Sequence, residues 1–296
     1  MPRWVIEPGF FSSPQVQGAL LIGGVAAVIS AVVGVFTVLR GQSFAGHALA
    51  DTAATGGSGM TLIGVNPLLG FVIGAVGGTG AMEASGVRHA RGRDLATGIV
   101  LGGSIGLASL FLYLDTATAT TGATQQILFG SVFATAPGTV PMVIALGVTS
   151  LAIIAIAYRP LLYSSISPEI AAAGGIPVRL VSLAYMLALA FAVALSSLAV
   201  GAILSTALLI GPPATAVRVT RRVTRALLAA IALGIFSTWL GVLLAYDSAT
   251  WFTDNNGLPV SFFIVAVIFS LYLAVDLLAL HRRRGRRTAA TARVTA

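Results

Sequence analysis

The 296-residue chain is too apolar to cover a soluble surface. Hydrophobic residues make up 57% of it and charged residues only 9%, with a mean hydropathy of +0.96, whereas a soluble domain has about 25% charged residues. The chain has no cysteine, and all 17 of its basic residues are arginine. These absences exclude disulfides, thiolate metal sites and a P-loop lysine, so any ATP that drives a process here must be hydrolysed by another polypeptide.

Nine apolar stretches follow one another along the chain, each near the length needed to cross a hydrocarbon core about 30 Å thick. They predict an all-α polytopic membrane protein. Because the chain has no ATP site of its own, we expect a transport subunit rather than an enzyme. Residues 1–17 are expected to form an irregular or interfacial lead-in, residues 18–280 the membrane domain, and residues 281–296 a basic cytoplasmic tail. The expected spans are residues 18–39, 43–59, 65–86, 95–114, 139–158, 180–198, 201–217, 226–246 and 259–280.

The arginines test this number of spans independently. With the N-terminus outside, every loop expected to be cytoplasmic contains arginine, and only Arg3 lies on the opposite side. This asymmetry is what the positive-inside rule predicts. The short, glycine-rich second span is required, because without it Arg88, Arg91 and Arg93 would lie outside. The net charge of +8 therefore indicates orientation and attraction to anionic lipid rather than nucleic-acid binding.

A polar stripe runs along this second span. Ser43, His47, Asp51 and Thr55 recur at four-residue spacing, which places them on one face of a helix. Ionisable groups inside a span usually face a cavity or the bundle interior and mark a path. An imidazole and a carboxylate suit zinc, manganese and iron alike. The alternative is a hydrogen bond between His47 and Asp51 that only stabilises the span.

Two later segments depart from regular spans. Residues 125–133 predict a short interfacial or re-entrant helix, which is tolerated only where protein surrounds it. In the span 201–217, Gly211, Pro212 and Pro213 interrupt an apolar run. Two successive prolines remove two backbone donors and predict a helix break or kink, which fits a transport path and simple packing equally well.

The longest internal hydrophilic loop, residues 159–179, predicts a short capped helix on the cytoplasmic face. A serine cap, a first turn with proline and an acidic residue, and a glycine stop are its signals. A helix held in this way between two spans can receive the movement of a partner. The residues concerned are Ser167, Pro168, Glu169, Ala173, Gly174 and Gly175.

Three stretches resemble the membrane permeases of bacterial ABC importers for zinc, manganese and iron. Residues 39–51 are similar to the family's arginine followed by Gly-Asp-x-x-x-His-Ala, and residues 127–131 match a second motif. The third stretch runs from Ser167-Pro-Glu to residues 200–216, which contain Ala-Leu-Leu-Ile-x-Pro-x-Ala-Thr-Ala. One departure concerns the polar pair: His47 takes the position of the family's aspartate, and Asp51 that of its histidine.

The resemblance implies a homodimeric permease in the bacterial plasma membrane, two cytoplasmic ATPases and an external metal-binding lipoprotein. It also implies that residues 164–178 form the coupling helix that docks onto the ATPase, with Glu169, Ala173 and Gly174. Across a two-fold axis, two copies of His47 and Asp51 offer up to four ligands, which suits a weak transit site.

The expected function is inward transport of a divalent transition metal (zinc, manganese or iron), with no permanently bound cofactor. Two alternatives stay open. The first is an ABC permease for a metal chelate, such as a siderophore, haem or cobalamin, which would not need the polar stripe. The second is a proton-coupled secondary carrier, in which His47 and Asp51 relay protons.

Overall fold

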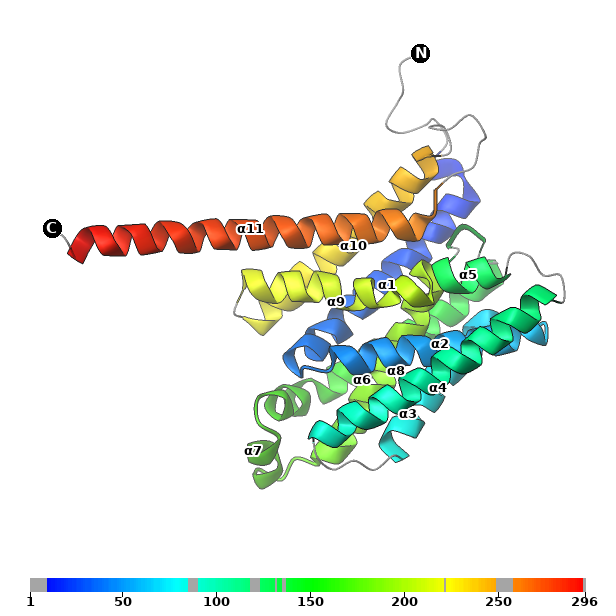
Figure 1. Ribbon diagram of the computed structural model, residues 1–296, viewed down its shortest axis with the longest axis horizontal. Coiled ribbons are helices and arrows are strands. Elements are labelled where there is room, and N and C mark those ends of the chain that lie inside the picture. The colour runs from blue at the N-terminus through cyan, green and yellow to red at the C-terminus, as the bar shows by residue number, and fades with distance from the viewer. Residues whose placement is uncertain are drawn as a thin grey trace, which may run out of the picture.

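The computed structural model describes residues 10–84, 90–117, 123–130, 132–134, 137–220, 222–248 and 258–294. Within them the chain forms eleven α-helices, three short 3-10 helices and no strand (Figure 1). The α-helices are α1 (Pro14–Leu39), α2 (Ser43–Leu62), α3 (Pro67–Ala84), α4 (Ala90–Ala117), α5 (Ala123–Phe129), α6 (Val140–Ile166), α7 (Pro168–Ala173), α8 (Val178–Val200), α9 (Ala202–Val219), α10 (Val223–Ser248) and α11 (Val260–Val294).

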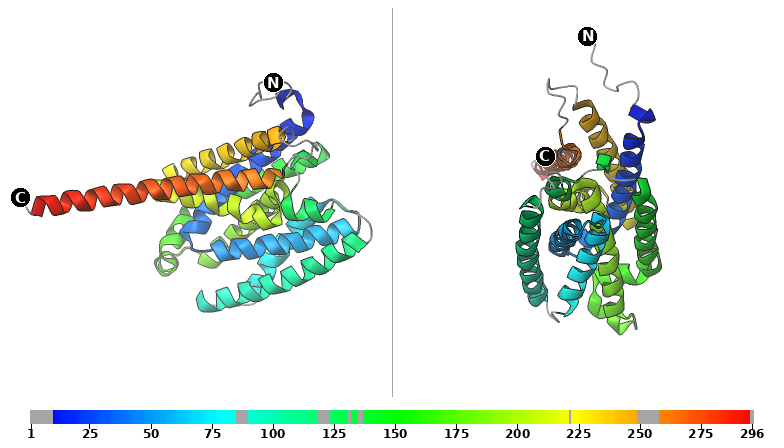
Figure 2. Two further views of the ribbon diagram at one scale, coloured as in Figure 1. Left: turned by 45° about the horizontal axis from the view of Figure 1, so that its top comes forward. Right: turned by 90° about the vertical axis from the view of Figure 1, so that its right-hand side faces the viewer.

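Each of the nine expected spans corresponds to one long helix, so the all-α membrane fold is confirmed. Among the described residues, eight helices are long and apolar enough to cross a membrane. The ninth is α2, whose 20 residues are rich in glycine, alanine and hydroxyl side chains. It lies inside the bundle in contact with α3, α4, α8 and α9 (Figure 2). Apart from Phe44 and His47, which are exposed, all of its residues are buried or partly buried, so it needs no continuous apolar surface.

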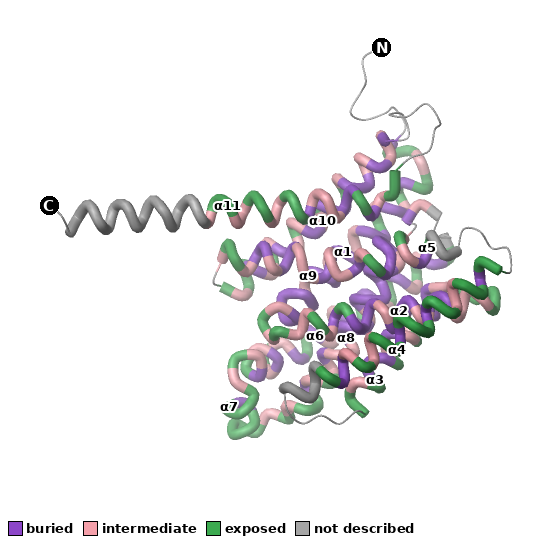
Figure 3. The backbone as a smooth tube through the Cα atoms, viewed as in Figure 1, coloured by how far each residue is buried: buried purple, intermediate pink, exposed green. Residues whose placement is uncertain are grey.

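The centre of the bundle is formed by α1 and α8. Of the 18 residues that form the most apolar stretch of each helix, 67% are buried, compared with 17% in α11. Figure 3 shows the buried residues gathered in the middle of the bundle and the exposed ones on outer helices such as α4. Phe36 on α1 and Tyr185 on α8 are among the largest side chains that are fully buried. The middle of the bundle is therefore packed with side chains.

Both ends of the membrane domain differ from the expected boundaries. α1 begins at Pro14, because the fixed φ of proline suits the first turn of a helix. Residues 14–17, expected to belong to the irregular lead-in, are therefore helical. At the other end, α11 runs without interruption to Val294, so most of the expected tail at 281–296 continues the last membrane helix.

The helix is not broken at Gly211, Pro212 and Pro213, so of the expected break or kink the break is wrong. α9 runs through all three residues from Ala202 to Val219, because membrane helices tolerate proline where neighbouring groups compensate for the missing donors. The boundary expected between the spans 180–198 and 201–217 is present at Gly201, which separates α8 from α9 with a φ of 88°. A side chain at Gly201 would also collide with Gly130, the residue that follows α5.

Polar side chains collect at the end of the bundle where α7 lies, on the left in Figure 1. Glu83, near the end of α3, pairs with Arg179 at the start of α8, with 3.5 Å between Oε1 and Nε. Arg218, near the end of α9, pairs with Asp276 on α11. Arg40 follows the last residue of α1 at the same end. Since arginine concentrates on the cytoplasmic side, this end is cytoplasmic and α1 begins outside.

Glycines bring α2 and α3 into backbone contact. A Cβ atom added to Gly56 would lie 2.8 Å from the Cα of Gly74, and one added to Gly70 would lie 2.8 Å from the Cα of Gly57. Membrane helices associate through such close packing, because lipid gives them no hydrophobic reason to pair. The glycine spacing therefore holds the polar helix α2 in the bundle.

We expect Gly74→Ala to lower the free energy of unfolding by about 1–3 kcal/mol, as overpacking does in other cores. The added methyl would meet the carbonyl oxygen of Thr52 on α2. Gly77→Ala is the matched control on the same helix, since a Cβ there meets nothing within 4 Å. Unfolding midpoints of the two variants in detergent check this expectation. Equal midpoints would contradict the backbone contact between α2 and α3.

Candidate functional site

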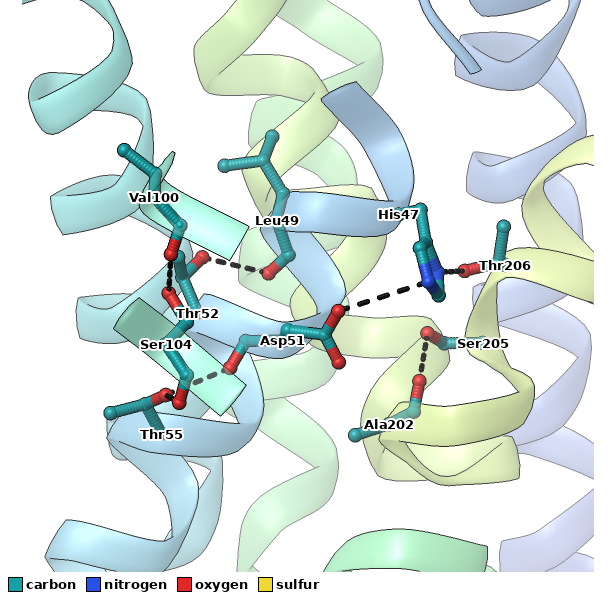
Figure 4. A network of polar contacts seen from close by, with 10 residues as sticks. All are labelled: His47, Leu49, Asp51, Thr52, Thr55, Val100, Ser104, Ala202, Ser205 and Thr206. Atoms are coloured by element: carbon teal, nitrogen blue, oxygen red, sulfur yellow. Dashed lines mark hydrogen bonds and ion pairs between the residues drawn. The ribbon is translucent and has the colours of Figure 1, made fainter. Parts of the chain in front are cut away.

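The first half of α2 carries the predicted pair, His47 and Asp51. The imidazole Nε2 lies 3.9 Å from the carboxylate Oδ2 across one helical turn. This separation is too long for a hydrogen bond, so the stabilising hydrogen bond considered above is not formed. The side chain of His47 is 46% exposed and that of Asp51 is 19% exposed. Both lone-pair-bearing groups point to the same space beside α9 (Figure 4).

A second helix orients the imidazole. Nδ1 of His47 lies 3.1 Å from the hydroxyl Oγ1 of Thr206, near the start of α9. Because the hydroxyl fixes Nδ1, Nε2 is left facing Asp51 (Figure 4). A ligand histidine held at its other nitrogen is the usual arrangement around metals. Thr206 was not predicted, although it lies within the third stretch that resembles the permeases.

The residues of the polar stripe on α2 point in two different directions. Thr55 turns away from His47, with its hydroxyl 2.9 Å from the carbonyl oxygen of Asp51 and 2.8 Å from that of Ser104 on α4. Ser43 is the first residue of α2 and is partly exposed. The candidate site is therefore centred on His47 and Asp51, while Thr55 joins α2 to α4.

A cavity of about 530 Å³ opens between α2, α3 and α4, on the side of α2 where Thr55 lies. Glycines form much of its wall, including Gly56, Gly74 and Gly103. Its described lining contains no ionisable side chain. The cavity thus lacks the ligands that a metal ion needs, and the pair at His47 and Asp51 lies outside it.

One chain supplies only part of a metal site. In the described part of the protein, no group of three or more His, Cys, Asp or Glu residues could hold a metal ion. His47 and Asp51 are two ligands, whereas a closed structural zinc site normally takes four. Two ligands alone allow only weak binding of a metal ion. Strong binding would need further ligands from outside this chain.

The short helix expected in the loop 159–179 is present as α7. The Ser167 hydroxyl accepts a hydrogen bond from the backbone N–H of Ile170, with 3.4 Å between Oγ and N, and Glu169 lies in the first turn. The helix ends at Ala173 and is followed by Gly174. Ile170 is 75% exposed at the cytoplasmic end of the bundle.

A bundle of membrane helices around a polar helix, with a short exposed helix between two spans on its cytoplasmic face, defines a multi-pass membrane permease. Residues 12–278 match the ABC 3 transport family, and the chain belongs to this family. It is therefore a bacterial plasma-membrane protein, and the resemblance found in its motifs is confirmed.

Known relatives extend over most of the chain. The manganese transport system membrane protein MntC of Halalkalibacterium halodurans is 32% identical over 247 residues, which cover 81% of this chain and 82% of that protein. The "Probable iron transport system membrane protein" of Haemophilus influenzae is 26% identical over 276 residues, covering 90% and 97%. The structure of PsaBC from Streptococcus pneumoniae in complex with Fab is similar in fold, with a TM-score of 0.77, 23% identity, and coverage of 90% and 92%.

We expect Thr206→Val to weaken the binding of a divalent transition metal about tenfold, because the imidazole would lose the hydroxyl that orients it. Thr206→Ser keeps the hydroxyl and is expected to bind as the wild type does. Titration calorimetry of the purified permease with Mn²⁺ as the probe distinguishes the two variants. Wild-type affinity in Thr206→Val would remove Thr206 from the site.

Proposed function

We propose that the chain is the permease subunit of an ABC importer for a divalent transition metal, with manganese as its main cargo. The observation that carries this proposal is the His47–Asp51 pair on α2, a helix whose other residues are mostly buried or partly buried in the bundle. Imidazole and carboxylate together suit manganese, iron and zinc. Relatives named for manganese transport, such as MntC, favour manganese, and a relative named for iron transport makes iron the next choice.

A homodimer would complete the site. The side chain of His47 is 46% exposed in the single chain, and Phe44 on the same helix is 44% exposed. A polar group facing lipid inside a membrane costs several kcal/mol, of the order known for unsatisfied groups in hydrocarbon. A two-fold partner would cover His47 and bring a second copy of it to the same axis. The two pairs would then offer four ligands around one path.

The energy for transport would come from a partner ATPase that docks at α7. Three large apolar side chains are exposed around this helix, at 79% for Ile166, 75% for Ile170 and 65% for Leu180. The positive-inside rule makes this end of the bundle cytoplasmic. The three side chains therefore lie on the side from which an ATP-hydrolysing partner would dock. A metal-binding lipoprotein would deliver the ion at the opposite end. Ser43 and Thr55 would support the path at its edges.

We expect His47→Ala and Asp51→Ala each to reduce manganese uptake by about two orders of magnitude. Each substitution removes one ligand per chain and thus two per dimer. Uptake is measured in cells that contain the ATPase and the binding protein, with the amount of permease in the membrane determined in parallel. Asp276→Asn is the control, because it also removes a carboxylate but one that pairs with Arg218 at the cytoplasmic end.

The same cells distinguish the alternatives. Uptake that persists when the partner ATPase is inactivated would favour the proton-coupled carrier. Uptake of an intact chelate by cells with His47→Ala would favour a chelate permease. Full manganese uptake by both single variants would remove the pair from the mechanism.

We expect Ile170→Asp to abolish binding of the ATPase, because it places a charge in the apolar surface that docking would bury. Ala172→Asp introduces the same charge on the same exposed helix and tests whether the loss of the isoleucine or the added charge prevents docking. Co-purification of the ATPase with tagged permease is the measurement, and unchanged Mn²⁺ binding shows that the membrane domain is intact. Full co-purification with Ile170→Asp would contradict docking at α7.

A further inference from the structure

The turn between α1 and α2 joins the two helices rigidly. Gly41 has a φ of 64°, which glycine adopts without the penalty of a side chain. Its N–H donates to the carbonyl oxygen of Val38 at 3.2 Å, and the N–H of Gln42 donates to that of Thr37 at 2.9 Å. This is the Schellman arrangement, which closes the end of a helix. Because α2 begins at the next residue, its first turn is fixed relative to the last turn of α1.

Arg40, inside this turn, binds two other helices at once. Its Nη1 donates to the hydroxyl of Ser164 on the last turn of α6 at 3.1 Å, and its Nη2 donates to the hydroxyl of Ser182 near the start of α8 at 3.3 Å. The guanidinium also lies over the ring of Tyr185, 5.0 Å from its centroid. The Ser164 hydroxyl donates in turn to the carbonyl oxygen of Leu161. A planar fork with several donors makes such a double contact possible, and an ammonium group does not reproduce it.

The buried Tyr185 ties the same cluster back to α1. Its hydroxyl donates to Oγ1 of Thr37 at 2.9 Å, and Oγ1 of Thr37 donates to the carbonyl oxygen of Val33 at 3.0 Å. Thr37 is also the residue whose carbonyl oxygen accepts from Gln42 in the turn. The ring, the guanidinium and the turn therefore form one connected network with Arg40 at its centre.

The network lies between α7 and the His47–Asp51 pair. α7 is held between the end of α6 and the start of α8, which are the two segments that Arg40 contacts. On the other side of the turn, His47 lies just over one helical turn into α2. A displacement of α7 would reach Ser164 and Ser182 first, and Arg40 joins both of them to the first turns of α2.

We propose that Arg40 is a positioning residue that transmits the movement of α7 to the His47–Asp51 pair. The inference rests on the proposed function, since it requires that α7 receives the ATPase and that the pair binds the cargo. At α6 and α8, Arg40 donates to the neutral hydroxyls of Ser164 and Ser182. Such contacts are made and broken at a lower cost than a buried ion pair, which suits an element that changes its arrangement in each cycle.

The experiment compares metal transport with ATP hydrolysis in the same vesicles. The permease–ATPase complex is reconstituted with Mn²⁺-loaded binding protein, and manganese uptake per ATP hydrolysed is measured. We expect Arg40→Lys, and separately Ser164→Ala combined with Ser182→Ala, to lower this ratio about tenfold, as substitutions within coupling networks can do. The rate of ATP hydrolysis is expected to stay within about twofold of the wild type, because α7 itself is intact.

Arg218→Lys is the matched control. Arg218 also lies over an aromatic ring, 4.8 Å from the centroid of Tyr272, and pairs with Asp276. Among the described residues, no hydrogen bond or ion pair joins it to α6 or α8, the helices that flank α7. Its ratio is expected to equal that of the wild type. Melting temperatures of all complexes show whether a variant is folded.

Two results would overturn the inference. One is a wild-type ratio in both Arg40→Lys and the serine double variant. The other is a parallel loss of uptake and hydrolysis with a lowered melting temperature in both, which would make Arg40 a purely structural residue. A wild-type complex that hydrolyses ATP without moving manganese would instead overturn the proposed function, so the two failures are distinguishable.

Discussion

Backbone contact at glycine is the constraint on which the arrangement of this bundle depends. Gly56, Gly70 and Gly74 bring α2 and α3 together without side chains between them. Gly34 brings the backbone of α1 close to the carbonyl oxygen of Leu209 on α9. In a helix this carbonyl would accept from the N–H four residues later, but that residue is Pro213, which has no N–H. In lipid, dispersion contacts and satisfied polar groups supply the stability that burial supplies in water. Larger residues at these positions would separate the helices that surround α2.

Hydroxyl groups then connect α2 and the turn before it to the rest of the bundle. Thr206 on α9 holds His47, and Thr55 reaches the backbone of Ser104 on α4. At the cytoplasmic end, Ser164 and Ser182 hold the arginine that precedes α2. Neutral hydroxyls can orient a charged or metal-binding group without neutralising it. The polar helix is thus positioned from several sides while its imidazole and carboxylate keep their ligand atoms.

The long-range charge pattern and the local capping signals made most of the fold predictable. The arginine asymmetry required α2 although its hydropathy is low, and Ser167 marked the start of α7. Thr206 could not be predicted, because its contact with His47 joins positions 159 residues apart. The break expected at Pro212 and Pro213 was wrong, because a membrane helix can continue through proline where neighbouring groups compensate for the missing donors. The boundary between α8 and α9 was expected between the spans 180–198 and 201–217, but its close contact with the backbone of Gly130 could not be, because only the folded chain brings Gly130 near Gly201.

The low hydropathy of α2 has a consequence for how the chain enters the membrane. A helix with so few large apolar side chains has little affinity for lipid, and a free polar helix is not retained there by its own composition. The helices that it packs against most extensively, α3 and α4, follow it in the sequence. We therefore expect α2 to be retained in the bilayer only together with α3 and α4, so that the three helices are inserted as one unit.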